Sequence, residues 1–349
     1  MLYLRDTKPG RFLKPLLFIS IELIMLIFHR LFTDPYMNIA AEEYFVKHAT
    51  DDMCMIWTNE QSVIIGKHQN AFAEINYPYV RENHIPVIRR ISGGGAVYHD
   101  TGNVNFTFIK KTDKANQVDF ERFTSVIVKF MQSLGIVVNI NKRNSLFAGS
   151  LKFSGHAEHI FHDKVLHHGT ILFNTDLEKL QNCLTPVKEY QGKAMASVRS
   201  DVGNIAPLLP EDIDIHQFIN NFVSWLIDFY TGSNSYELSP DETESIRQLS
   251  ETRYKTWQWN YGYSPAYTFK VNIPLQAGFL PVNIKVENGK FIQIVMPDET
   301  SGNPLTQLLN SMAGILHNEE NIDKFVENNH HGLELAGIKI VNFTEAFFK

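Results

Sequence analysis

The feature that most constrains this sequence is a run of three glycines, Gly93-Gly94-Gly95, between two apolar stretches. Val87–Arg90 precedes the glycines and Val104–Phe108 follows them, and both stretches predict β-strands. Glycines leave the main chain bare, so a ligand can approach closely and backbone N–H groups can point at an anion. The sequence therefore predicts a tight, anion-binding turn between two strands.

Charged residues flank this turn. Arg89 and Arg90 stand directly before it, and His99-Asp100 follows it. Arginine is the side chain best suited to grip phosphate or carboxylate through two parallel hydrogen bonds. A glycine run alone is more often a flexible surface loop, but the flanking charges favour a binding turn. It is neither a Walker loop nor a dinucleotide-binding fingerprint, because no Gly-Lys-Ser/Thr follows and the glycine spacing differs.

Strand and helix patterns mix along the first part of the chain. Val104–Phe108 alternates apolar with polar residues and predicts a half-buried strand. A helix is expected to begin near Asp34 or Pro35, since proline suits the first helical turn. Further strands are expected over 26–31, 53–57, 62–65 and 166–174, and helices over 120–134 and 215–230. This pattern is typical of the α/β or the α+β class.

The composition changes at about 235–250. A polar helix is expected to begin at Ser239-Pro240, and an aromatic cluster follows from Tyr254 to Tyr263. The pair Asn288-Gly289 between 282–287 and 290–296 predicts a hairpin with a type I′ turn. Pro304–Leu316 reads as a helix. We therefore expect one large domain over residues 25–245 and a small α+β domain over 250–349.

The N-terminal segment resembles a signal peptide in outline, because the apolar run Leu16–Phe28 follows basic residues. However, Glu22 interrupts the run, no small-residue cleavage site follows, and the run is shorter than the roughly 20 residues of a membrane span. We interpret residues 1–24 as an N-terminal extension with Met25 as a candidate start, and we expect no membrane association.

Composition excludes other classes of function. The net charge of −6 argues against a general nucleic-acid binder, which would show a basic face. The chain has two cysteines, Cys54 and Cys183, which form neither a disulfide framework nor a zinc-site spacing. A reducing cytoplasm is the expected location.

Two further polar segments are candidate site elements. Lys152 stands two residues before Ser154-Gly155, where it could face an anion from a strand end, although a lone lysine is usually a solvated surface charge. His167-His168 are adjacent, and adjacent strand residues point to opposite faces. We therefore expect one inward histidine that makes a hydrogen bond, rather than a metal-binding pair.

Taken together, these motifs resemble the signature of the lipoate–protein ligase family. They stand in the family's order and spacing, as the segments 89–103, 152–157, 167–173 and 196–200. The match is strong from Leu26 to Asn204. It continues weakly through Trp257–Gly262, which looks like the start of the family's C-terminal accessory domain. The resemblance implies a biotin/lipoate ligase catalytic domain, which is a mixed sheet with helices packed on its faces.

The resemblance also implies an activity, which is ATP-dependent ligation in two steps. The lipoate carboxylate attacks the α-phosphate of ATP, giving lipoyl-adenylate and pyrophosphate. A lysine amine of an acceptor lipoyl domain then attacks the adenylate. The implied acceptors are the E2 subunits of 2-oxoacid dehydrogenases and the glycine cleavage H protein. Mg²⁺ is expected to accompany ATP and offset phosphate charge.

The site residues are carried over from the family's motifs. Lys152 is expected to be the catalytic cation between lipoate carboxylate and α-phosphate, and Arg90 to hold phosphate oxygens. An apolar slot for the acyl chain is expected along Val104–Phe108. Many relatives have aspartate where this chain has Ser145, so the metal ligands stay open. The other residues expected to bind ATP or lipoyl-adenylate are Gly94, Gly95, Ala96, Val97, Tyr98, Asn103, Ala157 and His168.

Three alternatives compete with this interpretation. Octanoyl or lipoyl transferases share the fold but use a thioester donor and a cysteine nucleophile, and no cysteine stands near Asn144-Ser145. Cys54 lies in an apolar strand-like run, where an inert thiol is the default. Biotin ligases arrange their glycine–arginine motif differently. A non-catalytic binding protein is disfavoured by the presence of both Arg90 and Lys152.

Overall fold

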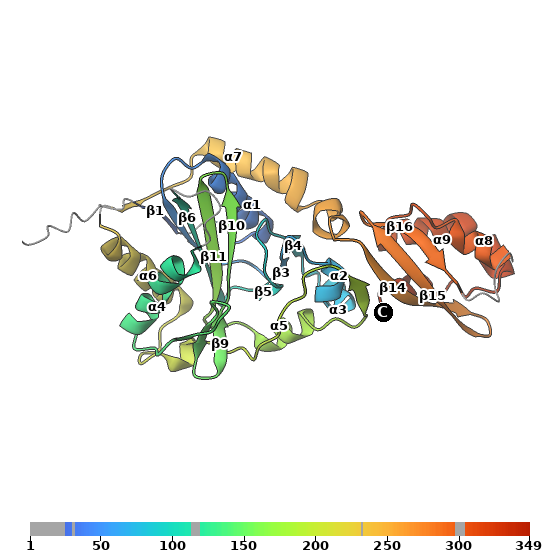
Figure 1. Cartoon of the computed structure of the whole chain (residues 1–349), viewed down its shortest axis with the longest axis horizontal. Helices are drawn as coiled ribbons and strands as arrows, with labels where there is room; N and C mark the ends of the chain where they lie inside the picture. Colours follow the sequence, from blue (N-terminus) through green and yellow to red (C-terminus); the bar gives the residue numbers. More distant parts are fainter. Residues whose placement is uncertain (1–24, 30–31, 113–118, 232, 297–303) are drawn as a thin grey trace, which may run out of the picture.

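The structure, a computed structural model, describes residues 25–29, 32–112, 119–231, 233–296 and 304–349 (Figure 1). The expected extension, residues 1–24, lies outside the described residues. The first strand was expected over 26–31, and β1 is described over Leu26–His29. Among the described residues, no helix combines the length and the apolar composition that a membrane crossing requires.

The centre of the fold is a mixed six-stranded sheet with the order β10-β11-β6-β2-β1-β13. The strands β13, β1 and β2 pair in parallel, whereas β2, β6, β11 and β10 pair antiparallel, which confirms the expected mixed sheet. The strands are β1, β2 (Met53–Trp57), β6 (Asn103–Lys111), β10 (His156–Phe161), β11 (Lys164–Leu172) and β13 (Asn234–Ser235).

The described residues also form three smaller sheets. The first has the order β4-β3-β5 and carries the glycine turn between β4 and β5, the second is β7-β8-β9, and the third is β12-β14-β15-β16. Their strands are β3 (Ser62–Ile65), β4 (Val87–Arg89), β5 (Val97–His99), β7 (Asn139–Ile140), β8 (Leu146–Ala148), β9 (Leu151–Ser154), β12 (Tyr190–Gly192), β14 (Tyr267–Leu275), β15 (Gly278–Glu287) and β16 (Lys290–Val295).

The helices begin and end at the residues that helix chemistry favours. In α1, Asp34 accepts hydrogen bonds from the backbone N–H groups of Tyr36 and Met37, and Pro35 opens the first turn. Gly135 follows the end of α4 with a φ of 79°, a conformation that suits glycine. The helices are α1 (Pro35–His48), α2 (Ala71–Glu74), α3 (Tyr77–Glu82), α4 (Phe120–Ser133), α5 (Leu177–Cys183), α6 (Ile215–Phe229), α7 (Pro240–Leu249), α8 (Pro304–Asn310) and α9 (Glu319–Leu335).

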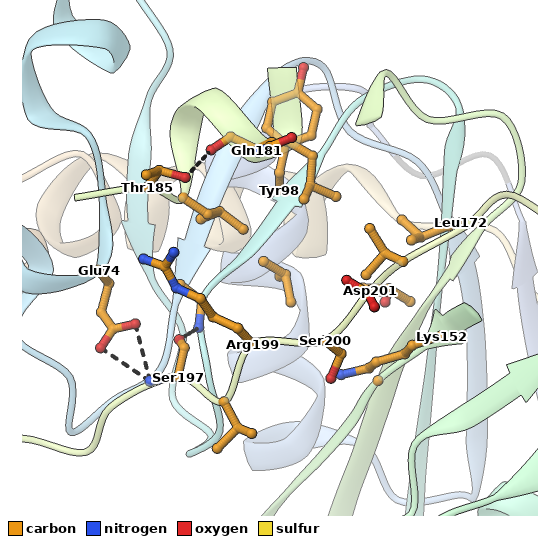
Figure 2. A pocket seen from close by; sticks show the side chains of 18 of the residues that line it. Glu74, Tyr98, Lys152, Leu172, Gln181, Thr185, Ser197, Arg199, Ser200 and Asp201 are labelled. Carbon is orange, nitrogen blue, oxygen red and sulfur yellow. Dashed lines mark hydrogen bonds between the residues drawn. The ribbon is translucent and has the colours of Figure 1, made fainter. Parts of the chain in front are cut away.

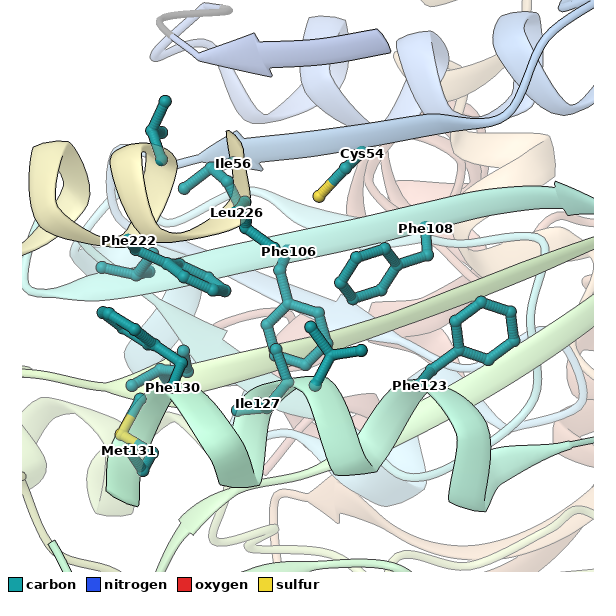
Figure 3. Packing of buried hydrophobic residues seen from close by; sticks show 14 of the residues in the cluster. Cys54, Ile56, Phe106, Phe108, Phe123, Ile127, Phe130, Met131, Phe222 and Leu226 are labelled. Carbon is teal, nitrogen blue, oxygen red and sulfur yellow. The ribbon is translucent and has the colours of Figure 1, made fainter. Parts of the chain in front are cut away.

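Both faces of the central sheet are buried. Helices α4 and α6 pack on one face through an aromatic cluster that includes Phe106, Phe123 and Phe130 (Figure 3). On the other face, α1 and α7 join a second apolar cluster. The prediction of a half-buried strand at Val104–Phe108 is therefore wrong, because the polar residues Asn105 and Thr107 are buried too, and Thr107 donates a hydrogen bond to Glu42 of α1.

The C-terminal strands and helices enclose an apolar cluster of their own, to which Phe72 of α2 also belongs. The hairpin is confirmed, since Asn288 and Gly289 both have positive φ, 51° and 75°. The helix expected over Pro304–Leu316 ends earlier, at Asn310. The strand β14 and the helix α9 were not predicted.

Candidate active site

Two cavities meet beside β9, one of about 860 Å³ and one of about 490 Å³. The larger cavity lies between the glycine turn, α5 and the segment 196–202, and Figure 2 shows the polar side chains around it. The smaller cavity extends toward α1 and β2 and has apolar walls from Ile39, Trp57 and Ile64. The residues that line both cavities are Ala96, Val97, Lys152, Gly155, Thr170, Ala196, Ser197 and Val198.

Lys152 stands at the junction of the two cavities. Its backbone is held on both sides: its N–H donates to the carbonyl of Asp201 (2.9 Å), and its carbonyl accepts from Gly203 N–H (3.1 Å). Burial, and to a smaller extent the positive charge of Arg143, lower the pKa of the Lys152 ammonium. A partly desolvated cation with a fixed backbone is placed to bind an anion strongly.

The buried side chain of Arg90 holds the glycine turn in place through hydrogen bonds. Its guanidinium donates to the carbonyls of Gly93 (2.6 Å) and Gly95 (2.8 Å), to the carbonyl of Ile64 (3.1 Å) and to Ser92 Oγ (2.9 Å). The side chain also lines the smaller cavity. Burial lowers its pKa to about 10, so the group stays charged at neutral pH. Arg90 thus connects the residues of the turn to one another and to β3.

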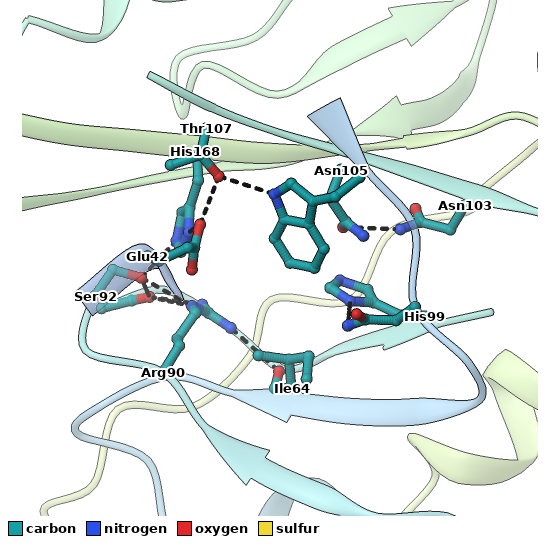
Figure 4. A network of polar contacts seen from close by, with 12 residues as sticks. Glu42, Ile64, Arg90, Ser92, His99, Asn103, Asn105, Thr107 and His168 are labelled. Atoms are coloured by element: carbon teal, nitrogen blue, oxygen red, sulfur yellow. Dashed lines mark hydrogen bonds and ion pairs between the residues drawn. The ribbon is translucent and has the colours of Figure 1, made fainter. Parts of the chain in front are cut away.

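The turn is tied to the central sheet by a buried polar network (Figure 4). His168 Nε2 lies 2.6 Å from Ser92 Oγ, and His168 Nδ1 lies 2.7 Å from Glu42 Oε1. Thr107 also donates to that carboxylate oxygen (2.6 Å) and accepts from Trp57 Nε1 (3.1 Å). Strands β6 and β11 and helix α1 therefore position the glycine turn together.

A close backbone approach explains why the turn can pack so tightly. Gly66 follows β3, and a Cβ on this residue would lie 2.2 Å from the carbonyl oxygen of Gly94. A Cβ on Gly93 would meet nothing within 4 Å. Any side chain at position 66 would push the glycine turn away from β3.

We predict opposite effects for alanine at these two glycines. Gly66→Ala should lower the free energy of unfolding by about 1–3 kcal/mol, because an added methyl in a filled space forces the backbone to shift. Gly93→Ala is the matched control, and it should be neutral or raise that free energy by up to about 1 kcal/mol through the unfolded state. Urea unfolding of both variants measures the difference. Equal destabilisation by both would contradict the close packing against Gly94.

The structure brings most of the expected site residues together. Those on the smaller cavity are Arg90, Gly94, Gly95, Ala96, Val97, Lys152, Ala157 and His168. Tyr98 borders the larger cavity, although its side chain is almost completely buried. Asn103 lines neither of the two cavities; it is fully buried and donates to Asn105 Oδ1 (2.9 Å).

Two expectations about the pocket need correction. The apolar slot was expected along Val104–Phe108, but only Asn105 of that strand lines the smaller cavity, because Phe106 and Phe108 face α4. One inward histidine was expected, but His167 and His168 are both buried and hydrogen-bonded, since both faces of the sheet are covered.

Ser197 is a site residue that sequence reasoning missed. Its hydroxyl accepts from Ala96 N–H (2.8 Å) and Gln69 Nε2 (3.0 Å), and its N–H donates to the Glu74 carboxylate. Burial raises the pKa of Glu74, and the hydrogen bonds from Ser197 oppose that shift. The sequence did contain a signal for this residue, because the segment 196–200 is one of the family motifs. The contact of Ser197 with the glycine turn could not be predicted, because it depends on how the chain folds.

The architecture is that of the biotin/lipoate ligase fold. A crystal structure of lipoate–protein ligase A bound with ATP matches with a TM-score of 0.60 at 24% identity, covering 70% of this chain and all of that one. A putative lipoate protein ligase from Thermoplasma acidophilum with bound lipoic acid matches with a TM-score of 0.58 at 24% identity, covering 69% of this chain and all of that one.

Sequence comparison gives the family. Residues 34–227 match the family model described as lipoyl protein ligase A/B catalytic domain. Lipoate–protein ligase 1 of Staphylococcus aureus is 37% identical over 297 residues, which is 84% of this chain and 90% of that protein. The chain therefore belongs to the lipoate–protein ligase family, whose members are enzymes.

Proposed function

We propose that this chain is an ATP-dependent lipoate–protein ligase. It converts lipoate to lipoyl-adenylate and transfers the lipoyl group to a lysine of acceptor lipoyl domains, such as those of 2-oxoacid dehydrogenase E2 subunits and the glycine cleavage H protein. The observation that carries the proposal is the junction of two cavities at one partly buried cation, Lys152. Family membership supports the same activity.

The two cavities suit the two substrates. In this proposal, the larger one takes ATP, because polar side chains such as Gln181, Arg199 and Ser200 border it. The smaller one takes the acyl chain along its apolar walls. The lipoate carboxylate and the α-phosphate then meet at Lys152, whose charge offsets their repulsion and follows the negative charge that develops in the transition state.

Mg²⁺ is part of the proposal as the companion of ATP. Within the described ranges, no group of three or more His, Cys, Asp and Glu side chains forms a metal site. Mg²⁺ bound to a nucleotide needs few protein ligands, since phosphates and waters supply most of them. Asp201, on the wall of the larger cavity, fits the role of such a ligand, and Ser145 lines the smaller cavity instead. Bound Mg²⁺ would neutralise phosphate charge.

The transferase alternative requires a cysteine nucleophile, and the two thiols are poorly suited to it. Cys54 and Cys183 are both free and fully buried, and burial raises the pKa of both thiols, that of Cys183 to about 12. A protonated thiol is a weak nucleophile. Neither cysteine lines either cavity.

We predict that the double variant Cys54→Ala/Cys183→Ala keeps ligation activity within about twofold of wild type, because neither thiol takes part. The assay follows lipoylation of a purified lipoyl domain by mass spectrometry. Removal of two small buried side chains lowers stability modestly, so the assay is run at low temperature with a urea titration as control. Loss of activity in a folded double variant would favour the covalent transferase.

The direct test of the proposed function uses wild-type protein. Incubation with lipoate, ATP and Mg²⁺ should release pyrophosphate, and addition of a lipoyl domain should give the lipoyl mass increase on one lysine. Omission of ATP should abolish the modification. Modification from a thioester donor without ATP would contradict the ligase assignment.

We also propose the domain division at about 245–250, with a catalytic domain over 25–245 and an accessory domain over 250–349. Separate apolar clusters on the two sides support it. The two domains are not fully separate, because β12 of the catalytic domain pairs with β14 of the accessory domain. A cytoplasmic location belongs to the proposal as well, and the two unpaired cysteines support it.

A further inference from the structure

Four side chains form a continuous series of hydrogen bonds on the α4 face of the central sheet, next to the junction of the two cavities. Ser154 Oγ lies 3.1 Å from His156 Nε2, His156 Nδ1 lies 2.9 Å from His167 Nε2, and His167 Nδ1 lies 2.7 Å from Glu158 Oε1. His156 and Glu158 alternate on β10 and share one face, and His167 stands directly opposite Glu158 on β11. The pairs therefore connect end to end.

One end of this series of hydrogen bonds lies beside the two cavities. Ser154 lines the larger cavity and His156 lines the smaller one. Lys152 is close by, because a Cβ on Gly155 would lie 3.2 Å from Lys152 Nζ. The hydrogen-bonded chain and the central cation thus flank the same junction.

The other end is enclosed by protein. The Glu158 side chain is 2% exposed, and its second oxygen accepts the backbone N–H of Asp119, which caps α4. The His167 ring is fully buried and stacks on Phe123 of α4. A carboxylate held away from water at the far end of a histidine pair is an arrangement that can accept a proton from the cavity.

We propose that Ser154, His156, His167 and Glu158 form a proton relay for the second step, and this inference rests on the proposed ligase function. The uncharged acceptor amine attacks the carbonyl carbon of lipoyl-adenylate, so that a C–N bond forms. The carbon–oxygen bond to the phosphate breaks, and its electron pair leaves with AMP. The surplus amine proton passes to Ser154, which donates its own to His156, and the transfers end on Glu158.

The donor directions of this chain are consistent with such a transfer. With Glu158 ionised, His167 donates from Nδ1, His156 donates from Nδ1, and Ser154 donates from its hydroxyl, so every hydrogen points toward the carboxylate. Burial lowers the pKa of both histidines, that of His167 to about 3, and raises the pKa of Glu158 to about 7. The proton therefore comes to rest on the carboxylate rather than on an imidazole.

Other titratable groups near the junction are less suited to this role. Both ring nitrogens of His168 are held, by Ser92 and Glu42. The Glu74 carboxylate is bound to the backbone of Ser197. Asp201 borders the larger cavity and is the rival base, so its variant is included in the test.

The test measures the two steps separately in His156→Ala and Glu158→Gln. Pyrophosphate release with lipoate and ATP reports the first step, in which no amine proton is lost. Single-turnover transfer from preformed enzyme-bound lipoyl-adenylate to a lipoyl domain reports the second. We expect adenylate formation within about threefold of wild type and transfer slowed by about 10²-fold, the low end for general-base catalysis. Millimolar imidazole should restore transfer in His156→Ala by filling the space beside the cavity.

His159→Ala is the matched control, since His159 lies on β10 but faces the opposite side from His156 and Glu158. It should leave both steps unchanged. A purely structural role of the relay would slow both steps together and would not respond to imidazole. Normal transfer in the relay variants, or selective slowing of transfer in Asp201→Asn alone, would overturn the inference. Absence of pyrophosphate release from wild type would instead refute the ligase function itself.

Discussion

Lys152→Ala should reduce lipoyl-adenylate formation by about 10³-fold while the fold stays intact. The first step brings a carboxylate and a nucleotide phosphate together, and Lys152 is the cation that stands where the two cavities join. A single preorganised donor in a site shielded from water contributes about 3–4 kcal/mol to transition-state stabilisation in other enzymes. The lysine side chain is only partly buried and lines both cavities, so its loss should not disturb the sheet.

Pyrophosphate release in the presence of saturating lipoate, ATP and Mg²⁺ measures this prediction, and far-UV circular dichroism with urea unfolding verifies the fold. Lys142→Ala is the matched control, because Lys142 lies in the same part of the chain but is exposed and lines neither cavity. Lys152→Arg keeps the charge at a different position and should fall between the two. A Lys152→Ala variant that makes adenylate at a near wild-type rate would show that the cation has another role.

Local patterns in the sequence were sufficient for the elements that have strong periodicity or clear turn residues. Met53–Trp57 and Ser62–Ile65 are strands over the expected residues, and the Asn288-Gly289 turn is where the hairpin was expected. The strand β14 had a usable signal, since Tyr267, Phe269 and other buried residues alternate with polar ones.

The helix α9 was harder to predict because it is mostly polar and buries few residues, among them Ile322, Phe325 and Leu333. An exposed, polar helix lacks the apolar stripe on which helix prediction depends. The prediction of the site was limited for a different reason, which is the large sequence separation of its residues. The Glu42–His168 contact joins residues 126 positions apart, and only the packing of α1 on the sheet brings them together.

The two adjacent arginines show the same limit. The sequence suggested that both side chains could bind anions. However, they are neighbours at the end of β4, so they point to opposite sides and have different surroundings. Arg90 holds the glycine turn beside the cavity, whereas Arg89 is fully buried and faces away. The six acceptors within hydrogen-bond distance of its guanidinium are the carbonyls of Gly66, Lys67, Gln69, Trp259 and Asn260 and the hydroxyl of Ser264.

Arg89→Met should therefore lower the free energy of unfolding by about 3–5 kcal/mol, because several buried acceptors lose their donor and each unsatisfied group costs about 1–3 kcal/mol before relaxation. Methionine fills a similar volume but leaves buried carbonyls without a donor. The segment 259–264 should also become sensitive to limited proteolysis, because Arg89 joins it to the glycine-turn sheet. Urea unfolding and a timed protease digest measure the two effects.

Arg81→Met provides the control for this prediction, since Arg81 also connects the two parts of the chain, through a surface ion pair with Glu319 (2.8 Å) in which the arginine is exposed. Exposed pairs contribute less than about 1 kcal/mol, so this variant should unfold nearly as wild type does. Under conditions where Arg89→Met remains folded, its KM for ATP should be unchanged, because Arg89 lines neither cavity. A tenfold rise in that KM without loss of stability would mean that Arg89 binds phosphate after all, and that the glycine turn moves when ATP enters.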